Sequence, residues 1–203
     1  MNGKTIVMAL AALSMAASVE AQAWDAPSFL PPRPGDDVGV YLFWPDRSDF
    51  AFKGIWRQSG NLNLGVHVGY VDYGVVDRFL AAGETWGALM SAGAGFPVDV
   101  SWTLGAGAAF GDGTVLSIPL GLTIGRALAL SPLTFQVYGH PRLALIVASG
   151  GGNTTTDLDG FFDIGADLHL NEDWKARLGI TLGGVDAYGI GLAYRFGRGV
   201  AVR

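Results

Sequence analysis

Hydrophobic and polar residues alternate along much of the chain. Between residues 62 and 70, every even position holds Leu, Val or Tyr, whereas the odd positions hold Asn63, Gly65, His67 and Gly69. The stretches 98–110, 114–125 and 187–196 repeat this alternation. Successive side chains of a strand point to opposite faces, so a period of two predicts strands with one apolar face.

The same test predicts ten strands. They lie near residues 38–44, 50–57, 62–71, 85–96, 98–110, 114–125, 133–147, 158–170, 174–182 and 187–196. Turn residues such as Asp112-Gly113 separate neighbouring strands, as they do in hairpins. An irregular first pair would reduce the count to eight. The pattern predicts an all-β protein built from antiparallel strands.

Composition and charge limit what surrounds this sheet. Half of the residues are hydrophobic and 15% are charged. After residue 23, however, no stretch reaches the roughly 20 apolar residues that a membrane-spanning helix needs. The net charge of −5 and the lack of a basic patch give no reason to expect a nucleic acid partner. The chain has no cysteine, so disulfides do not stabilise it.

The first 23 residues have the features of a secretory signal peptide. Lys4 precedes an apolar stretch that ends at Val19, and Ala21-Gln22-Ala23 matches a small-residue cleavage site. We therefore expect residues 1–23 to be removed and the mature chain to begin at Trp24. A signal peptide also predicts that the protein is exported.

Three further segments complete the expected domain organisation. Residues 24–37 are rich in proline and predict an extended periplasmic lead-in, although they could equally be disordered. Residues 38–196 contain all the predicted strands and form the single folded domain. Residues 197–203 form a short C-terminal tail.

The distribution of charge indicates that lipid covers the apolar face. Alternation alone also fits a soluble sandwich, a lipocalin or a jelly roll. The opposite face, however, holds mostly Gly, Ala, Ser and Thr, which suits a crowded interior. The strand charges share that face, as expected if each Arg or Lys turned toward the bilayer midplane costs about 2–4 kcal/mol. These charges are Lys53, Arg57, Asp99, Arg142, Asp159, Asp163, Asp167, Lys175, Arg177 and Arg195.

Aromatic residues on the apolar face lie mainly at strand ends. Membrane barrels place such residues in two girdles at the bilayer interfaces. The predicted girdle residues are Trp44, Trp56, Tyr70, Trp86, Phe96, Phe110, Trp174, Tyr188 and Phe196. Trp102 is an exception, because it lies inside its predicted strand.

The last strand resembles the C-terminal insertion signal of outer-membrane barrels. The residues that carry this resemblance are Tyr188, Ile190, Leu192, Tyr194 and Phe196. Such signals usually end the chain, whereas residues 197–203 follow here. The segment Ser117-Ile118-Pro119-Leu120-Gly121-Leu122 is also similar to one that recurs in these barrels.

With its ten strands and signal peptide, the whole mature chain resembles the superfamily of small outer-membrane β-barrel proteins, which includes OmpA-like and OmpW-like barrels. The resemblance implies a closed antiparallel up-and-down transmembrane β-barrel in the outer membrane of a Gram-negative-type envelope. Its partners would be outer-membrane lipid and, during insertion, the barrel-assembly machinery. The sequence contains no indication of an oligomeric state.

The connections between strands predict which loops face outward. Both termini of an even-stranded barrel lie on the periplasmic side, so the odd-numbered connections are the outer ones. They include the two longest, 72–84 and 149–157. The even-numbered connections, at 59–61, 97, 127–132 and 171–173, are predicted to be short periplasmic turns.

Polar residues on the inward face predict a network in the lumen. Its members are His67, Asp99, Gln136, Tyr138, His140, Arg142, Asp163, Asp167, His169, Lys175, Arg177 and Arg195. A three-residue loop at 171–173 would put Asp167 opposite Arg177, and His169 opposite Lys175, giving a cross-strand ion pair. We expect these charges to neutralise one another in a nearly filled lumen, because a buried unpaired charge is strongly destabilising.

These features favour a structural or surface-interaction barrel. The alternatives are a narrow porin or small hydrophobic-solute channel and, third, a lipid-modifying outer-membrane enzyme. A lipase-like site needs Ser beside His, and none of the three histidines has a Ser two positions along, as the lipid A deacylase pattern requires. His140 and His169 near Asp163 and Asp167 could suggest a metal site, but network histidines are commoner. We therefore expect no enzymatic activity, no metal and no cofactor.

Overall fold

The computed structural model describes residues 24, 26–46, 48–74, 77–93, 95–130 and 133–196. The predicted signal peptide, residues 1–23, and the predicted tail, residues 197–203, lie outside the described residues. No helix in the described part of the chain is long and apolar enough to cross a membrane.

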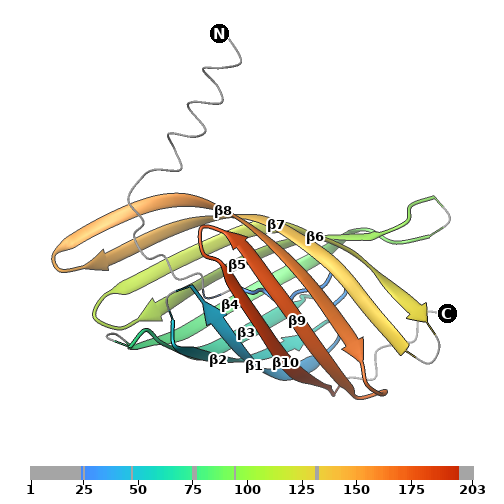
Figure 1. The fold of residues 1–203 in the computed structure, drawn as a ribbon. Coiled ribbons are helices and arrows are strands. Elements are labelled where there is room, and N and C mark those ends of the chain that lie inside the picture. The colour runs from blue at the N-terminus through green and yellow to red at the C-terminus, as the bar shows by residue number, and fades with distance from the viewer. Residues whose placement is uncertain are drawn as a thin grey trace, which may run out of the picture.

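The described residues form ten strands that close into one antiparallel barrel (Figure 1). The strands are β1 (Asp37–Pro45), β2 (Phe50–Gln58), β3 (Leu64–Asp72), β4 (Asp77–Met90), β5 (Asp99–Phe110), β6 (Thr114–Leu130), β7 (Leu133–Gly150), β8 (Asn153–His169), β9 (Trp174–Gly183) and β10 (Ala187–Arg195). Each strand pairs with its neighbours in sequence, and β1 pairs with β10 from Asp37↔Arg195 to Pro45↔Ala187. The prediction of ten strands and a closed up-and-down barrel is confirmed.

The two ends of the barrel differ in what they carry. We call the end where β1 begins and β10 ends the terminal end, and the opposite end the distal end. The turns after β1, β3, β5, β7 and β9 lie at the distal end, because consecutive strands run antiparallel.

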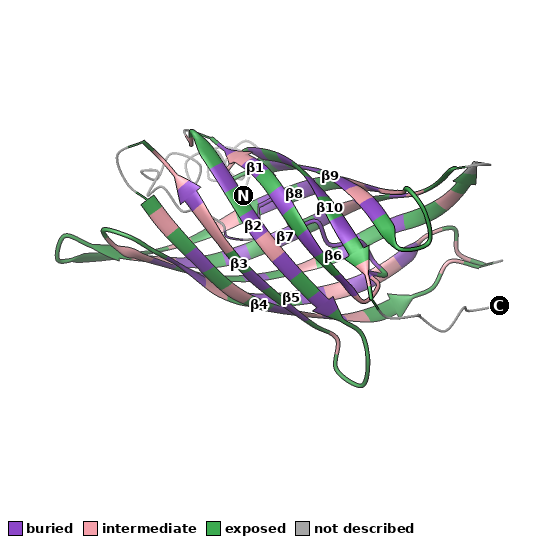
Figure 2. Cartoon of the chain, turned by 90° about the horizontal axis from the view of Figure 1, so that it is seen from below, coloured by how far each residue is buried: buried purple, intermediate pink, exposed green. Residues whose placement is uncertain are grey.

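Burial alternates along the strands, as the sequence pattern predicts. In β1, Tyr41 and Phe43 are at most 1% exposed, whereas Val40 and Leu42 are 64% and 40% exposed. Figure 2 shows the resulting bands of buried and exposed positions across neighbouring strands. One set of side chains fills the interior, and the other covers the outside of the barrel.

Neither of the two long outer loops that the sequence predicts is present. β4 begins at Asp77, so only residues 73–76 separate it from β3. β7 and β8 are joined by Gly151 and Gly152, whose φ angles are +58° and +83°. Glycine adopts positive φ at little cost, so two residues suffice for this turn. Thr154 to Thr156 extend β8, because β-branched residues favour strands.

The terminal end also departs from the prediction. β4 ends at Met90 after a register shift at Ala88, and residues 91–98 form an eight-residue connection closed by a bridge between Gly93 and Phe96. The predicted strand 85–96 and one-residue turn at Pro97 are therefore wrong. Residues 127–130, predicted to be a turn, belong to β6 and pair with β7.

Candidate functional site: a plugged lumen

The lumen contains a segment of the chain itself. Trp24 and residues 26–34, which we call the N-terminal plug, run inside the barrel ahead of β1. The side chains of Trp24, Ala26, Ser28, Phe29 and Leu30 are at most 2% exposed. The predicted periplasmic placement of this segment is wrong, because its apolar side chains are removed from water by entering the barrel.

Two strand cations bind the backbone of the plug. Lys53 Nζ donates to the carbonyl oxygens of Pro27 and, at 3.4 Å, of Trp24. Arg57 donates to the carbonyls of Phe29 at 2.9 Å and Ser28 at 3.0 Å. Both cations lie on β2 and are fully buried. The plug therefore supplies acceptors to charges that water would otherwise solvate.

The same Arg57 joins the first of three ionic groups. Its Nε donates to Glu84 Oε1 at 2.7 Å. His67 Nε2 lies 3.0 Å from the same carboxylate oxygen, and the edge of Trp24 meets the His67 ring at a centroid separation of 5.1 Å. This group thus links β2, β3 and β4 to the plug.

The second group confirms the predicted register of the β8–β9 hairpin. Asp167 pairs with Arg177 and His169 with Lys175 across the two strands. Arg177 Nε donates to Asp167 Oδ2 at 2.9 Å, and its Nη2 donates to Asp37 Oδ2 at 2.7 Å. Lys175 Nζ donates to Asp37 at 2.8 Å, and Arg177 also reaches the Tyr41 hydroxyl at 2.7 Å. The group spans the β1–β10 closure.

The third group surrounds His140 on β7. Its Nδ1 lies 2.9 Å from Ser28 Oγ of the plug and 3.3 Å from Asp163 Oδ2. Its Nε2 lies 2.9 Å from Thr103 Oγ1. Arg142 Nε donates to Asp163 Oδ2 at 3.0 Å. The order Thr103, His140, Asp163 matches that of a hydrolase triad. The cavity beside it measures about 10 Å³, space for one water.

The remaining predicted network residues also face inward. Asp99 forms an ion pair with Arg33 of the plug, whose Nη2 lies 2.6 Å from Asp99 Oδ1. Gln136 and Tyr138 are buried. His169 and Arg195 are half-buried at the terminal end, where Arg195 Nη2 lies 3.3 Å from His169 Nδ1. All twelve predicted lumen residues are thus buried or half-buried.

Several residues of this network were not among the predicted lumen residues. They include Asp37, Tyr41, Lys53, Arg57 and Glu84. Lys53 and Arg57 were already on the inward face, so their charge was a usable signal. Glu84 was assigned to a loop, and Asp37 to the lead-in. With them, the buried side chains of the described chain hold five cations and five anions.

The distal half of the lumen is apolar. Trp24 and Ala26 of the plug pack there against side chains from most of the strands. The other members of this cluster are Phe43, Ala51, Val71, Leu80, Ala109, Val115, Ala144, Ile146, Phe161 and Ala187. The lumen is therefore divided into a charged terminal half and an apolar distal half.

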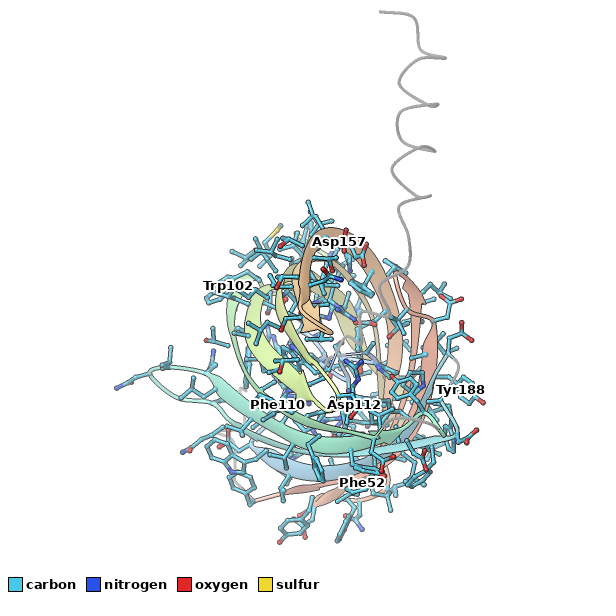
Figure 3. All side chains as sticks on the ribbon, turned by 90° about the vertical axis from the view of Figure 1, so that its left-hand side faces the viewer. Phe52, Trp102, Phe110, Asp112, Asp157 and Tyr188 are labelled. Atoms are coloured by element: carbon cyan, nitrogen blue, oxygen red, sulfur yellow. The ribbon has the colours of Figure 1, made fainter. Side chains whose placement is uncertain are left out.

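Most of the predicted girdle aromatics do lie on the outside, near the two ends. Trp44 stacks on Tyr188 at the distal end with ring centroids 5.4 Å apart, and Trp56 stacks on Phe196 at the terminal end at 6.4 Å. Figure 3 shows Phe52, Trp102 and Tyr188 pointing away from the barrel.

Trp86 is the exception and the prediction for it is wrong, since only 5% of it is exposed and it faces the interior. It shares the inward parity of β4 with Glu84. Residues 81–83 of this strand are all small, so their sequence does not indicate which face of the strand is apolar.

The side chains on the outside of the barrel indicate which solvent surrounds it. Between the two aromatic bands, exposed positions carry large apolar side chains. Examples that are at least 49% exposed are Val40, Leu120, Leu143, Ile164 and Leu192. The strand charges face inward instead, apart from Arg126, which is exposed near the terminal end of β6. A water-soluble protein does not cover itself in this way, whereas a bilayer requires it. The chain is a transmembrane β-barrel. Antiparallel single-chain barrels of this kind span the bacterial outer membrane, which is the location of this one.

Comparisons with known proteins give matches to solved structures alone. No protein-family model and no curated protein matches the sequence. The KdgM porin in complex with disordered oligogalacturonate is 9% identical, with 79% of this chain and 99% of that chain covered and a TM-score of 0.44. A bacterial polysaccharide outer membrane secretin is 11% identical over 79% of this chain and 58% of its own, with a TM-score of 0.45. Omp33 of Acinetobacter baumannii is 9% identical over 79% and 97%, with a TM-score of 0.35.

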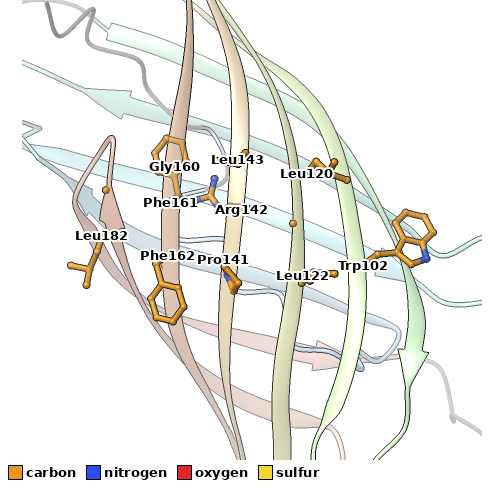
Figure 4. Close-up of a pocket in the computed structure, with 12 residues that line it drawn as sticks. Trp102, Leu120, Leu122, Pro141, Arg142, Leu143, Gly160, Phe161, Phe162 and Leu182 are labelled. Atoms are coloured by element: carbon orange, nitrogen blue, oxygen red, sulfur yellow. The ribbon is translucent and has the colours of Figure 1, made fainter. Parts of the chain in front are cut away.

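The outer wall of the barrel carries an apolar groove of about 790 Å³ that crosses β5 to β9 (Figure 4). Trp102, Leu120, Leu143 and Phe162 are among the residues that line it. Beneath the groove, the pairing of β6 with β7 is interrupted between the pairs Gly121↔Arg142 and Ile124↔Gly139. Pro141 lies in this gap and has no N–H to donate. In a membrane barrel this surface faces hydrocarbon.

Proposed function

We propose that the protein is a structural or surface-interaction barrel of the outer membrane whose lumen is closed by its own N-terminal plug. The observation that carries this proposal is the burial of the plug, whose carbonyls accept hydrogen bonds from Lys53 and Arg57. A barrel of this size has a lumen that side chains nearly fill. An added chain segment leaves little room for solute.

The terminal end faces the periplasm in this proposal. Even-stranded outer-membrane barrels keep both termini on that side, with the other end outside the cell. The distal hairpins, of which β7–β8 extends farthest past its neighbour β9, would then be presented at the surface. Surface presentation rather than transport is the role that this arrangement favours.

The proposal includes no catalytic activity. Thr103, His140 and Asp163 have the order of a triad, but Arg142 holds Asp163 and the plug serine Ser28 contacts His140. The small cavity beside them has no space for a lipid or peptide substrate. Overexpression should therefore leave the lipid A of the envelope unchanged. A new lipid A species that disappears with Thr103→Val would contradict this.

Two partners belong to the proposal. Outer-membrane lipid would contact the apolar outside of the wall. The barrel-assembly machinery would insert the chain by recognising β10, whose Tyr188, Ile190, Leu192 and Tyr194 are all at least 39% exposed on the outside.

Planar-bilayer conductance tests the closed lumen. The mature chain should be electrically silent, whereas a variant lacking residues 24–34 should show discrete openings. A variant lacking residues 197–203 serves as the matched truncation and should stay silent. Heat-modifiable migration on gels establishes that all three chains are folded. Steady conductance from the intact chain would favour the narrow channel, and a silent plug deletion would mean that the plug does not close the lumen.

A further inference from the structure

Strand β8 is longer than the strand beside it. On one edge, β8 pairs with β7 along its whole length, from Gly150↔Asn153 to Thr134↔His169. On the other edge, β9 pairs with it only from Phe161 onward. On this side, residues 153–159 of β8 therefore pair with no described strand and form a free edge at the distal end of the barrel (Figure 1).

The free edge presents a defined set of backbone groups. The Gly160 carbonyl accepts a hydrogen bond from Gly184 N at 3.2 Å, so Gly160 directs its backbone groups toward the β9 side. In an antiparallel ladder these directions alternate from residue to residue. The N–H and C=O groups of Thr154, Thr156 and Leu158 consequently point to the free edge, while the intervening residues bond to β7.

The sequence and setting of this edge suit the addition of another strand. Three successive threonines, Thr154 to Thr156, favour extended backbone, and all three are exposed. The hairpin that carries them is held by continuous pairing with β7, so the edge is ordered before any partner arrives. An exposed sheet edge of this kind recruits extended peptides through main-chain hydrogen bonds.

Charge indicates which partner fits. Asp157 and Asp159 lie within the free edge itself, and Asp112 and Asp186 lie in neighbouring distal turns. Figure 3 labels Asp157 on the β7–β8 hairpin. A second copy of this chain would bring the same negative charges to the edge, which disfavours its binding. An extended segment with Lys or Arg would complement them.

We propose that residues 153–159 of β8 form a docking site for an extended, basic segment of another polypeptide, which binds as an added strand. The presence of such a partner outside the cell rests on the proposed orientation of the barrel. Binding to the edge itself does not depend on that orientation.

The test uses the full mature barrel in detergent and a fluorescent synthetic peptide of about ten residues that alternates threonine with lysine, long enough to span the edge. Fluorescence anisotropy should report saturable binding, and hydrogen exchange should show new protection of the Thr154, Thr156 and Leu158 amides. A matched peptide with glutamate in place of lysine should bind at least tenfold more weakly. Absence of binding by the lysine peptide would overturn the proposal.

Matched substitutions at one position separate edge pairing from side-chain contact. Thr156→Pro removes an N–H that points away from β7, a position where strands tolerate proline, and should weaken peptide binding at least tenfold. Thr156→Val keeps the N–H and should bind like the wild type. Equal binding by both variants would overturn edge pairing. Concentration-dependent dimerisation through this edge in sedimentation experiments would overturn the proposed basic partner, because a second copy of the chain would then occupy the edge. Heat-modifiable migration checks the fold of each variant.

A surface-labelling experiment distinguishes failure of the proposed orientation from failure of the proposed docking edge. An epitope inserted between Gly151 and Gly152 should be detected on intact cells if the distal end is outside. Detection only after permeabilisation, together with peptide binding in detergent, would contradict the proposed orientation while leaving the docking edge in place.

Discussion

Arg177 shows how single residues hold this lumen together. It is fully buried and donates to Asp37, Asp167 and Tyr41, and so connects β9 to β8 and across the closure to β1. Removal of one partner from a buried ionic group leaves the others charged and unpaired, which costs more than the intact pair contributes. The balance of five buried cations and five buried anions makes every member of the network sensitive in this way.

We expect Arg177→Met to lower the free energy of unfolding by about 3–5 kcal/mol, because Asp37 and Asp167 lose their shared guanidinium. Urea unfolding of the barrel in lipid vesicles measures the change. The control is Arg126→Met, since Arg126 is exposed, and its effect should stay within about 0.5 kcal/mol. Similar losses for the two variants would contradict the network.

Gly165 illustrates a different residue-level constraint. A Cβ at this position would lie 2.2 Å from the Tyr138 ring, which fills the space that the glycine leaves. Gly165→Ala should therefore destabilise the barrel by about 1–3 kcal/mol through overpacking. Gly83 is the matched strand glycine, since the nearest atom to a Cβ there is 3.8 Å away. In the same unfolding assay Gly83→Ala should be near neutral; equal costs would rule out the Tyr138 clash.

At the scale of elements, β10 has two roles. It closes the barrel by pairing with β1, and its outward side chains form the expected insertion signal. Its apolar residues point outward while Ala187, Gly189, Gly191 and Ala193 are buried against the lumen contents. Trp174 and Tyr194 lie in contact across β9 and β10 at the terminal end, with ring centroids 5.2 Å apart. The strand therefore contributes both closure with β1 and one part of an aromatic band.

Replacing Tyr194 and Phe196 together by serine should slow insertion severalfold, because both side chains are exposed at the terminal end of the wall. The rate is measured as the appearance of the heat-modifiable band in cells. Leu62→Ser is a control for loss of one exposed apolar residue, since Leu62 precedes β3 in a turn and should leave the rate unchanged. An unchanged rate for the double variant would remove the role proposed for β10.

Elements with strong contrast between their faces were predictable from the sequence, and others were not. The β8–β9 register followed from a short loop, which Asn171 fixes by accepting hydrogen bonds from the amides of Asp173 and Trp174. The inward and outward faces of β4 could not be predicted in this way, because residues 81–83 are Ala or Gly on both faces. Trp86 was therefore assigned to the outside, although it is buried.

The plug was unpredictable for another reason. It has no periodicity, and most of its polar contacts are made by backbone carbonyls, such as those of Pro27 and Phe29, which every sequence possesses. Its apolar residues, Trp24, Phe29 and Leu30, gave no indication of which surface they would meet. Only the charges of Lys53 and Arg57, already assigned to the inward face, indicated that the lumen has to supply hydrogen-bond acceptors.

For the whole molecule, the arrangement is inverted relative to a soluble protein. Charged side chains and the plug occupy the inside, and large apolar side chains occupy the outside. The absence of cysteine allows single cysteines to be introduced at chosen positions without a background. Leu143, 57% exposed on the wall, and Thr155, exposed on the projecting hairpin, are suitable sites.

The most direct measurement is quenching by lipids brominated on their acyl chains. A small fluorophore is attached to Leu143→Cys or Thr155→Cys in the barrel reconstituted into vesicles, with heat-modifiable migration as the check on folding. Hydrocarbon contact predicts strong quenching at position 143 and almost none at position 155. Unquenched fluorescence at position 143, matching that at 155, would show that water or protein covers the apolar wall and would contradict the membrane barrel.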